Sequence, residues 1–396
     1  MEQTFPKPYI PLTPLLDYNH SGTSTDRSLP SILELPNKLF TTSGRTAIAL
    51  LLEHEKIGKN DQVLIPAFHC EAMVAPAQWA NATPTFYRIN PDTSPDINDI
   101  KTKLTPNTKA IIVTHYFGFM QQLQAIRTLC DQHQIILIED CAHALFGGDK
   151  ECPIGTTGDY AIASTMKFLP IYEGGILASK HNKLSDIQIS HPSLTFQLKS
   201  LINTVENTVA YQRLGILGKF INQIIKLKTA VWNQIKKSKH SYNPVKIGPA
   251  SSEGGFGLDS DWVHKSCSLT TKLIIRLSNH NKSIQLRRQH YQKLHHALAA
   301  LPNSHPLFEK LPENIVPFVY PLYVENPGHY FPKLKQQGVP IWRFGEYLDQ
   351  EITSKDFPVS VDYSKHIFQF PCHQSLTEQE LDWMINKITK TLSTHS

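Results

Sequence analysis

The hydrophobic pattern between residues 41 and 180 alternates between short apolar runs and longer segments with helical spacing. The apolar runs predict strands at 62–66, 84–89, 109–114, 135–139, 160–164 and 174–178. The segments between them, such as 45–54, 71–80 and 120–133, carry apolar residues at the period of a helix. Strands that alternate with helices predict an α/β domain with a largely parallel sheet. The run at 135–139 is typical of a buried parallel strand.

Outside this region the pattern changes. Residues 1–38 are rich in Pro, Ser, Thr and Asp, which predicts an irregular arm. The stretch 194–240 predicts one or two long helices, with lysines interspersed among the apolar positions. A Gly/Ser-rich loop at 251–257 is followed by a helical pattern at about 262–300. The last amphipathic helix is expected at 377–392, with Thr377 as its cap and Glu380 three residues later.

These changes divide the chain into three predicted parts. Residues 1–38 form the arm, and residues 39–258 form a large domain with a helical insertion at about 190–245. Residues 259–396 form a smaller domain that mixes helices with short strands. A chain of 396 residues with 40% hydrophobic residues is long enough to bury a sizeable core in two domains.

Charge and cysteine usage narrow the class of protein. The net charge is +5, but no Lys/Arg stripe alternates with aromatics, so no nucleic-acid partner is predicted. Six scattered cysteines without a C-x-x-C pair predict a reducing cytoplasm. The sequence shows neither a signal peptide nor an apolar run of eighteen residues. The basic amphipathic part of 194–240 predicts packing on the domain or on a dimer mate, and the alternative is peripheral contact with an anionic membrane.

Two residues that follow predicted strands carry the first candidate chemistry. Asp140 follows the strand at 135–139, and ligands of open α/β sheets bind outside such strand ends. Its carboxylate can hold a protonated pyridine nitrogen, and the alternative is an ordinary helix cap. Lys167 follows another apolar run and has apolar neighbours, so desolvation can lower the pKa of its amine and make it a nucleophile for an aldehyde. The alternative is a lysine that extends to solvent.

A third candidate is the polar start of the helix predicted at 45–54. The run Thr42-Ser43-Gly44-Arg45-Thr46-Ala47 places small residues where the first backbone N–H groups of the helix are free. A phosphate can bind to such a helix start, and the alternative is a simple cap. The three pieces occur in one order along the chain, which makes the joint pattern more specific than any one of them.

Taken together, these motifs resemble those of the DegT/StrS family of pyridoxal 5′-phosphate (PLP)-dependent sugar aminotransferases, and the chain looks like a divergent member. The motifs that carry the resemblance are Ser43-Gly44-Arg45-Thr46-Ala47, Ile65-Pro66-Ala67-Phe68, the run from Thr108 to Gly118, Glu139-Asp140-Cys141-Ala142-His143, and Lys167 six residues before Glu173-Gly174-Gly175. The resemblance covers about 41–180. It implies fold type I, with a mostly parallel seven-stranded sheet in the large domain and a smaller α+β C-terminal domain.

The resemblance also implies roles for individual residues. Lys167 would form the internal aldimine and shuttle a proton, Asp140 would pair with the pyridine nitrogen, and His143 stands where a glutamine usually contacts the phenolic oxygen. Cys70 takes the place of an aromatic that often stacks on the ring, which leaves Phe68 or His69 for that contact. The predicted cofactor-binding residues are Gly44, Arg45, Thr46, Phe68, His69, Asp140, His143, Ser164 and Lys167.

The implied reaction is amino transfer from an amino acid, with glutamate expected, to a keto-sugar or related carbonyl compound in a cytoplasmic homodimer. Arg343 of the small domain is a candidate for binding the substrate, since its planar fork matches a carboxylate. Other PLP chemistry, such as a dehydratase or lyase, and a catalytically silent scaffold are the alternatives. No metal is predicted, because His69, His115 and His143 lack the spacing of a zinc site.

Overall fold

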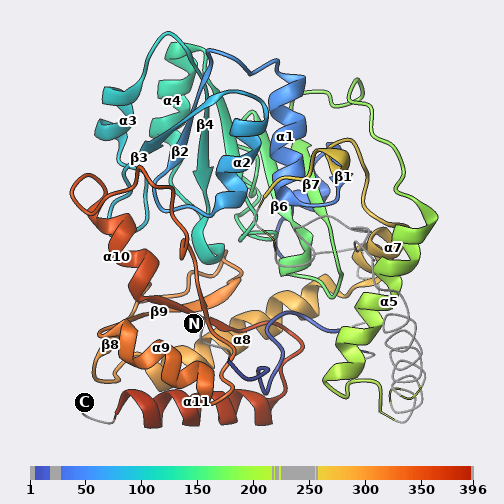
Figure 1. Ribbon diagram of the computed structural model, residues 1–396, viewed down its shortest axis with the longest axis vertical. Helices are drawn as coiled ribbons and strands as arrows, with labels where there is room; N and C mark the ends of the chain where they lie inside the picture. Colours follow the sequence, from blue (N-terminus) through green and yellow to red (C-terminus); the bar gives the residue numbers. More distant parts are fainter. Residues whose placement is uncertain are drawn as a thin grey trace, which may run out of the picture.

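The computed structural model describes residues 5–17, 28–215 and 257–393, together with Gly218, Gln223 and Gly255. Figure 1 shows a large sheet with helices around it and, below it in that view, a second sheet with its own helices. Buried side chains of both sheets, such as Ile112 and Leu322, belong to one continuous hydrophobic core. None of the helices in the described part of the chain is long and apolar enough to cross a membrane.

The large sheet has seven strands in the order β1-β7-β6-β5-β4-β2-β3. Strands β3, β2, β4, β5 and β6 are parallel to their neighbours, whereas β7 pairs antiparallel with both β6 and β1. The strands are β1 (Asn37–Thr41), β2 (Gln62–Pro66), β3 (Thr83–Tyr87), β4 (Thr108–Thr114), β5 (Ile136–Asp140), β6 (Tyr160–Ser164) and β7 (Gly175–Ser179). The predicted α/β class with a mostly parallel seven-stranded sheet is confirmed.

The six predicted strands all exist, with ends that differ by up to two residues. The largest omission is β1, which begins inside the predicted irregular arm and pairs with β7 about 140 residues away in the sequence. The side chains of β1 are mostly half-buried, so the strand lacks the apolar run that marks β5. Asp140 is the last residue of β5 and pairs with Ile162 of β6, because the strand extends one residue beyond the predicted end.

Helices and short 3-10 turns connect these strands. Ser43 caps α1, since its hydroxyl accepts from the Thr46 backbone N–H and the Thr46 hydroxyl accepts from the Ser43 N–H. Of the predicted insertion, α5 lies within the described residues, and most of 214–240 lies outside them. The helices are α1 (Gly44–His54), α2 (Glu71–Trp79), α3 (Ile97–Lys103), α4 (Gln124–His133), α5 (Leu194–Ala210) and α7 (Leu269–Leu277), and the 3-10 turns are η2 (Ile32–Glu34), η3 (Tyr116–Gly118), η4 (Thr165–Lys167) and η6 (Ser260–Trp262).

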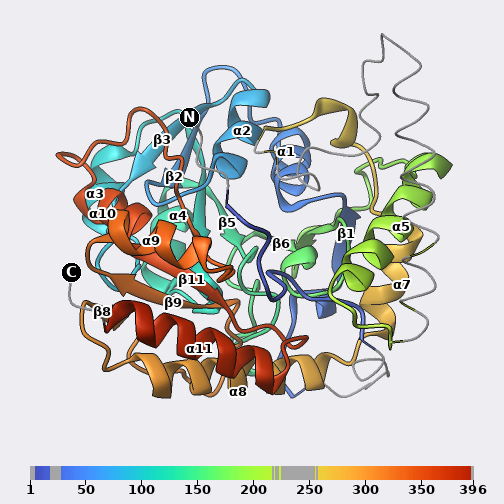
Figure 2. The ribbon, with the colours of Figure 1, turned by 60° about the horizontal axis from the view of Figure 1, so that its bottom comes forward.

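The second sheet is antiparallel, with the strand order β10-β11-β9-β8. Figure 2 shows α8 and α11 side by side along this part of the molecule. The predicted cap of the last helix is confirmed, because the Thr377 hydroxyl accepts from the Glu380 N–H. The elements are α8 (His280–Leu298), β8 (Ser304–Pro306), β9 (Val319–Val324), α9 (Pro327–Gln336), β10 (Trp342–Arg343), α10 (Pro358–His366), β11 (Ile367–Pro371) and α11 (Glu378–Leu392).

The helix predicted at about 262–300 is wrong as one element, because it is broken into α7 and α8. The helical backbone ends at Ser278, and Asn279 then caps α8 by accepting from the Lys282 N–H. Asparagine competes with the helical backbone in this way at helix starts. The break separates α7, which lies beside α5, from α8, which packs under the second sheet.

Candidate active site

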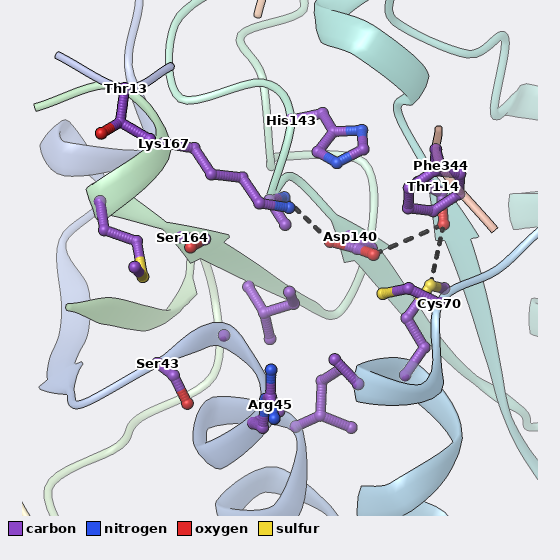
Figure 3. A pocket seen from close by; sticks show the side chains of 17 residues that line it. Thr13, Ser43, Arg45, Cys70, Thr114, Asp140, His143, Ser164, Lys167 and Phe344 are labelled. Atoms are coloured by element: carbon purple, nitrogen blue, oxygen red, sulfur yellow. Dashed lines mark hydrogen bonds between the residues drawn. The ribbon is translucent and has the colours of Figure 1, made fainter. Parts of the chain in front are cut away.

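A cavity of about 210 Å³ lies where the carboxyl ends of β4, β5 and β6 meet the first turn of α1 (Figure 3). Its position follows from topology, since the strand ends of a parallel sheet leave a crevice at one edge. Figure 3 shows Lys167 extending toward Asp140, with Ser43 and Arg45 across the cavity from them. The labelled residues that line it are Thr13, Ser43, Arg45, Cys70, Thr114, Asp140, His143, Ser164, Lys167 and Phe344.

Asp140 presents its carboxylate to this cavity from the end of β5. One oxygen, Oδ1, accepts from the Ala142 N–H at 2.8 Å, and Oδ2 is 3.5 Å from the Thr114 hydroxyl. Burial raises the pKa of this carboxyl, while the Ala142 N–H and the charge of Lys167 act in the opposite direction. The acid therefore has few donors within the chain and retains capacity to bind a cationic group.

Lys167 reaches the cavity from η4, directly after β6. Burial lowers the pKa of its amine, Cys70 and Asp140 raise it, and Arg45 lowers it further. The Nζ atom lies 5.5 Å from the centre of the Phe318 ring, which is an apolar neighbour. A desolvated amine next to a carboxylate is the arrangement that favours a nucleophilic or proton-transferring lysine.

The start of α1 forms the anion-binding side of the cavity. Gly175 of β7 allows this close packing, because a Cβ atom there would lie only 2.2 Å from the Ser43 carbonyl carbon. Gly44 and Ser164 line the cavity, whereas the buried Thr46 side chain does not. The Thr46 hydroxyl instead bonds the Ser43 backbone and completes the cap.

Arg45 lines the same side, but its guanidinium already has partners. Its NH1 atom donates to the carbonyl oxygens of Gly255 at 2.8 Å and Gly257 at 2.7 Å. Burial lowers the pKa of this guanidinium, and the charges of Cys70 and Glu71 oppose that effect. A loop about 210 residues later thus holds Arg45 at the cavity.

His143 packs between aromatic rings at the cavity. Its ring stacks on Phe318 at a centroid distance of 4.8 Å, and Phe344 meets it edge-on at 5.0 Å. Its Nδ1 accepts from the Phe117 N–H at 3.4 Å, which leaves the proton on Nε2. Burial, assisted by Lys167, lowers the pKa of His143 well below its ordinary value, so the ring is a neutral donor.

The two aromatic residues predicted to contact the cofactor ring do not line the cavity. Phe68 is fully buried and stacks on Tyr116, and His69 stacks on Phe86 while its Nε2 accepts from the Asp349 N–H. Burial lowers the pKa of His69 to about 4. The next residue, Cys70, lines the cavity and caps the start of α2.

A second cavity of about 300 Å³ adjoins the first and shares Arg45, Cys70, His143, Lys167 and Phe344 with it. The small-domain residues Phe318, Trp342, Arg343 and Glu346 complete its wall. Arg343 pairs with Glu346 and lies 4.4 Å from the centre of the Phe331 ring. The predicted substrate residue Arg343 is therefore beside the lysine, with an acid already paired to it.

Several lining residues were not predicted from the sequence. Thr114 ends β4, so its neighbourhood with Asp140 follows once these strands are paired. Phe344 comes directly after β10. Thr13 belongs to the N-terminal segment 5–17, whose Tyr9 N–H donates to Gly338 and carries no sequence signal for the site.

One other cluster has the ligand types of a metal site. His115, Glu139 and Cys141 offer atoms within 4.8 Å of one another. His115 Nδ1, however, accepts from the Gln121 N–H, so its Nε2 carries the proton that faces Glu139 at 2.9 Å. Metal binding needs an unprotonated nitrogen, and these hydrogen bonds argue for a structural cluster.

Solved structures define the class of fold. A DegT DnrJ EryC1 StrS aminotransferase from Brucella abortus superposes with a TM-score of 0.60 at 19% identity, over 91% of this chain and 87% of that one. The structure of ntda from Bacillus subtilis with bound cofactor PMP gives a TM-score of 0.60 at 17% identity, over 91% and 74%. The chain has the fold of fold-type-I PLP-dependent transferases.

The family follows from a sequence comparison. Residues 26–212 match the DegT/DnrJ/EryC1/StrS aminotransferase family, and over this segment the resemblance predicted from the motifs is confirmed. This segment contains the whole large sheet together with Asp140, His143 and Lys167.

Curated relatives match part of the chain. The GDP-perosamine synthase of Vibrio cholerae is 30% identical over 157 residues, which is 39% of this chain and 43% of that protein. The L-glutamine:2-deoxy-scyllo-inosose aminotransferase of Streptomyces kanamyceticus is 35% identical over 138 residues, which is 34% and 32%. The chain thus matches well under half of the length of these relatives.

Proposed function

We propose that this protein is a PLP-dependent aminotransferase that moves an amino group from an amino acid to a keto-sugar or a related cyclic ketone. The observation that carries the proposal is the convergence of the Lys167 amine and the Asp140 carboxylate on one cavity. The cavity also meets the free N–H groups at the start of α1, where a phosphate binds favourably.

The residues present fit this cofactor. Gly44, Arg45 and Ser164 line the side that would hold the phosphate, Asp140 faces a position for the ring nitrogen, and Lys167 faces a position for the aldehyde. The open bonding capacity of Asp140 and the missing side chain at Gly175 support this assignment. When bound, PLP supplies an electron sink that allows a C–H bond next to nitrogen to lose its proton.

The side chains of this protein have separate tasks in the proposed reaction. The Lys167 Nζ accepts a proton from one carbon and returns it to another, for which a lowered pKa is suited. The Asp140 carboxylate stabilises positive charge on a bound ring, and the His143 Nε2–H donates to an oxygen of it. Ile48, Ile162 and Met166 make the cavity wall apolar, which excludes water from the reacting groups.

The substrates are proposed from the second cavity and from the relatives. Arg343 is placed to contact a carboxylate or phosphate of the substrate if its pair with Glu346 opens. One relative's name specifies L-glutamine as the donor, so glutamine joins glutamate as a candidate donor here. The relatives' names include a GDP-sugar product and a cyclic ketone, which are the acceptor classes to test.

The first experiment tests covalent cofactor binding by Lys167. In the parent protein, PLP should give an absorption band that borohydride converts into a stable label on Lys167. Lys167→Ala should lose this label, and amino transfer should fall by about 10³-fold. Lys109→Ala, which changes an exposed lysine of β4, is the matched control and should behave as the parent. A labelled Lys167→Ala protein, or a parent that binds no PLP, would contradict the proposal.

The second experiment separates aminotransferase from lyase and scaffold. The protein is incubated with PLP and isotopically labelled glutamate or glutamine, without and with a keto-sugar nucleotide. An aminotransferase forms the 2-oxo acid in stoichiometric half-reaction without the acceptor and turns over with it. Release of ammonia from the sugar substrate alone would favour a lyase or dehydratase, and no reaction with any donor would favour a scaffold.

We further infer a homodimer in the cytoplasm. Leucines spaced along α5 and α7 are exposed, and a second copy can cover such an apolar surface. The exposed leucines are Leu194, Leu198, Leu201, Leu269, Leu273 and Leu277. All six cysteines are free thiols, which fits a reducing compartment. Sedimentation equilibrium measures the assembly, and liposome co-sedimentation tests the predicted membrane contact through 194–240.

A further inference from the structure

Arg287 is a completely buried arginine of α8 that lies close to the candidate active site. Within the described residues, all three of its side-chain nitrogens donate to neutral oxygens, and no carboxylate is among these acceptors. The acceptors are the backbone oxygens of Lys167, Phe168, Pro317 and Phe318 and the side-chain Oε1 of Gln374.

The geometry of these contacts uses the whole guanidinium fork. The NH2 atom is 3.0 Å from the Lys167 oxygen, NH1 is 3.0 Å from the Phe318 oxygen, and Nε is 2.9 Å from Gln374. The guanidinium also lies 4.5 Å from the centre of the Phe168 ring. Gln374 completes the arrangement, because its Nε2 donates to the Phe168 oxygen at 2.7 Å.

The energetic cost of this arrangement indicates that it is more than packing. Burial lowers the pKa of Arg287 to about 10, so the side chain stays charged at neutral pH without an acid as partner. A buried charge is tolerated only when its hydrogen bonds are complete. The planar fork of arginine meets this demand, whereas the single ammonium of lysine cannot reach the same set of acceptors.

The residues that Arg287 holds are those that face the cavities. Lys167 carries the amine of the first cavity, and Phe318 lines the second. The Phe318 ring stacks on His143 and lies 5.5 Å from the Lys167 Nζ. Arg287 therefore joins the backbone of the lysine turn in the large domain to a wall contributed by the small domain.

We propose that Arg287, supported by Gln374, is a positioning residue that fixes Lys167 relative to Phe318 and His143 and keeps the lysine amine in its desolvated place. The chemical use of that amine rests on the proposed function above, but its placement does not. Arg287 touches the carbonyl of Lys167 and acts through that backbone. It does not line either cavity.

The test measures the Lys167 amine directly in protein without cofactor. Competitive acetylation with acetic anhydride, followed by mass spectrometry, gives the pH midpoint at which Lys167 becomes reactive. The variants are Arg287→Lys, which retains a charge but loses the fork, and Gln374→Met, which removes the second donor to Phe168. Arg288→Lys is the matched control, because the neighbouring Arg288 donates to Pro312 and Ile315 instead.

Loss of positioning should let water reach the amine, and its pKa should then return toward the ordinary value of lysine. We expect the labelling midpoint of Lys167 to rise in Arg287→Lys and Gln374→Met and to stay unchanged in Arg288→Lys. PLP affinity should fall by about tenfold or more in the first two variants, the order expected for hydrogen bonds to a charged group. Labelling of Lys109 in the same samples should not change.

Two outcomes would overturn the proposal. A folded Arg287→Lys protein with a lower unfolding temperature but the parent labelling midpoint would show a purely structural role. If Arg287→Lys does not fold, an unchanged midpoint in Gln374→Met has the same consequence. A parent that binds no PLP would remove the proposed function, yet the labelling midpoints would still decide whether Arg287 positions the amine.

Discussion

Glu139 and Asp140 are neighbouring, buried acids on β5, but their surroundings differ completely. The carboxylate of Glu139 accepts from the backbone N–H groups of Gly155, Thr157 and Gly158 and from the His115 Nε2. These donors lie between 2.6 and 3.1 Å away. Such a fully bonded carboxylate stabilises the 155–158 turn and has no capacity left for a ligand.

Asp140, on the opposite face of the strand, has one close backbone donor and a hydroxyl at 3.5 Å. Successive side chains of a strand point to opposite faces, so adjacent acids inevitably enter different environments. The comparison shows how to separate a carboxylate that holds the fold from one that is available for chemistry. The number of internal donors distinguishes them, although both are buried to the same extent.

The largest expected effect comes from Asp140→Asn. A neutral amide cannot stabilise a protonated ring nitrogen, so kcat/KM should fall by about 10² to 10³-fold. Burial raises the pKa of Asp140, so the ionised form costs stability as the pH rises through the raised pKa, and the cost is complete above it. The variant should therefore be at least as stable as the parent at pH 7 in urea unfolding. A loss of stability together with unchanged activity would place Asp140 with Glu139 as a structural acid.

Glu139→Gln should show the reverse behaviour. The amide NH₂ of glutamine would face backbone N–H donors of the 155–158 turn, and about 3 kcal/mol of unfolding free energy should be lost. PLP affinity of the folded fraction should change by less than about tenfold. Urea unfolding and cofactor titration measure the two quantities. A stable variant that no longer binds PLP would remove the distinction between the two acids.

The smallest effect is expected for His143→Gln. Both side chains offer a neutral N–H donor at pH 7, because burial and Lys167 lower the pKa of His143 well below its ordinary value. The change in kcat/KM should stay below about tenfold. Profiles of kcat/KM between pH 5.5 and 9 should have the same shape for parent and variant. An acid limb that disappears in the variant would mean that His143 itself titrates in the reaction.

The sequence predicted the parts of the molecule that local pattern controls. The run at 135–139 located β5, and the small residues before α1 located its first turn. The cap at Thr377 was equally readable, since capping depends on residues three positions apart. The strand β1 escaped because its half-buried side chains show no run and its pairing partner is remote.

The ring contact shows the limit of motif reading. Phe68 and His69 are the aromatic residues nearest to the motif position, yet both point into packed surroundings. The backbone turns at this point so that Cys70, at the start of α2, meets the cavity. A shift of one residue after a strand changes which side chain reaches the site, and periodicity does not resolve a shift of that size.

The sequence by itself determined where the strands run and that an acid and a lysine follow two of them, because strand and helix patterns are local properties of the chain. Tertiary structure alone decided which side chains share the cavity. Thr13 and Phe344 reach it from segments about 150 residues to either side of Lys167, and Arg287 holds the lysine turn from α8. Such contacts depend on how distant segments pack, and no local pattern of apolar and polar residues encodes them.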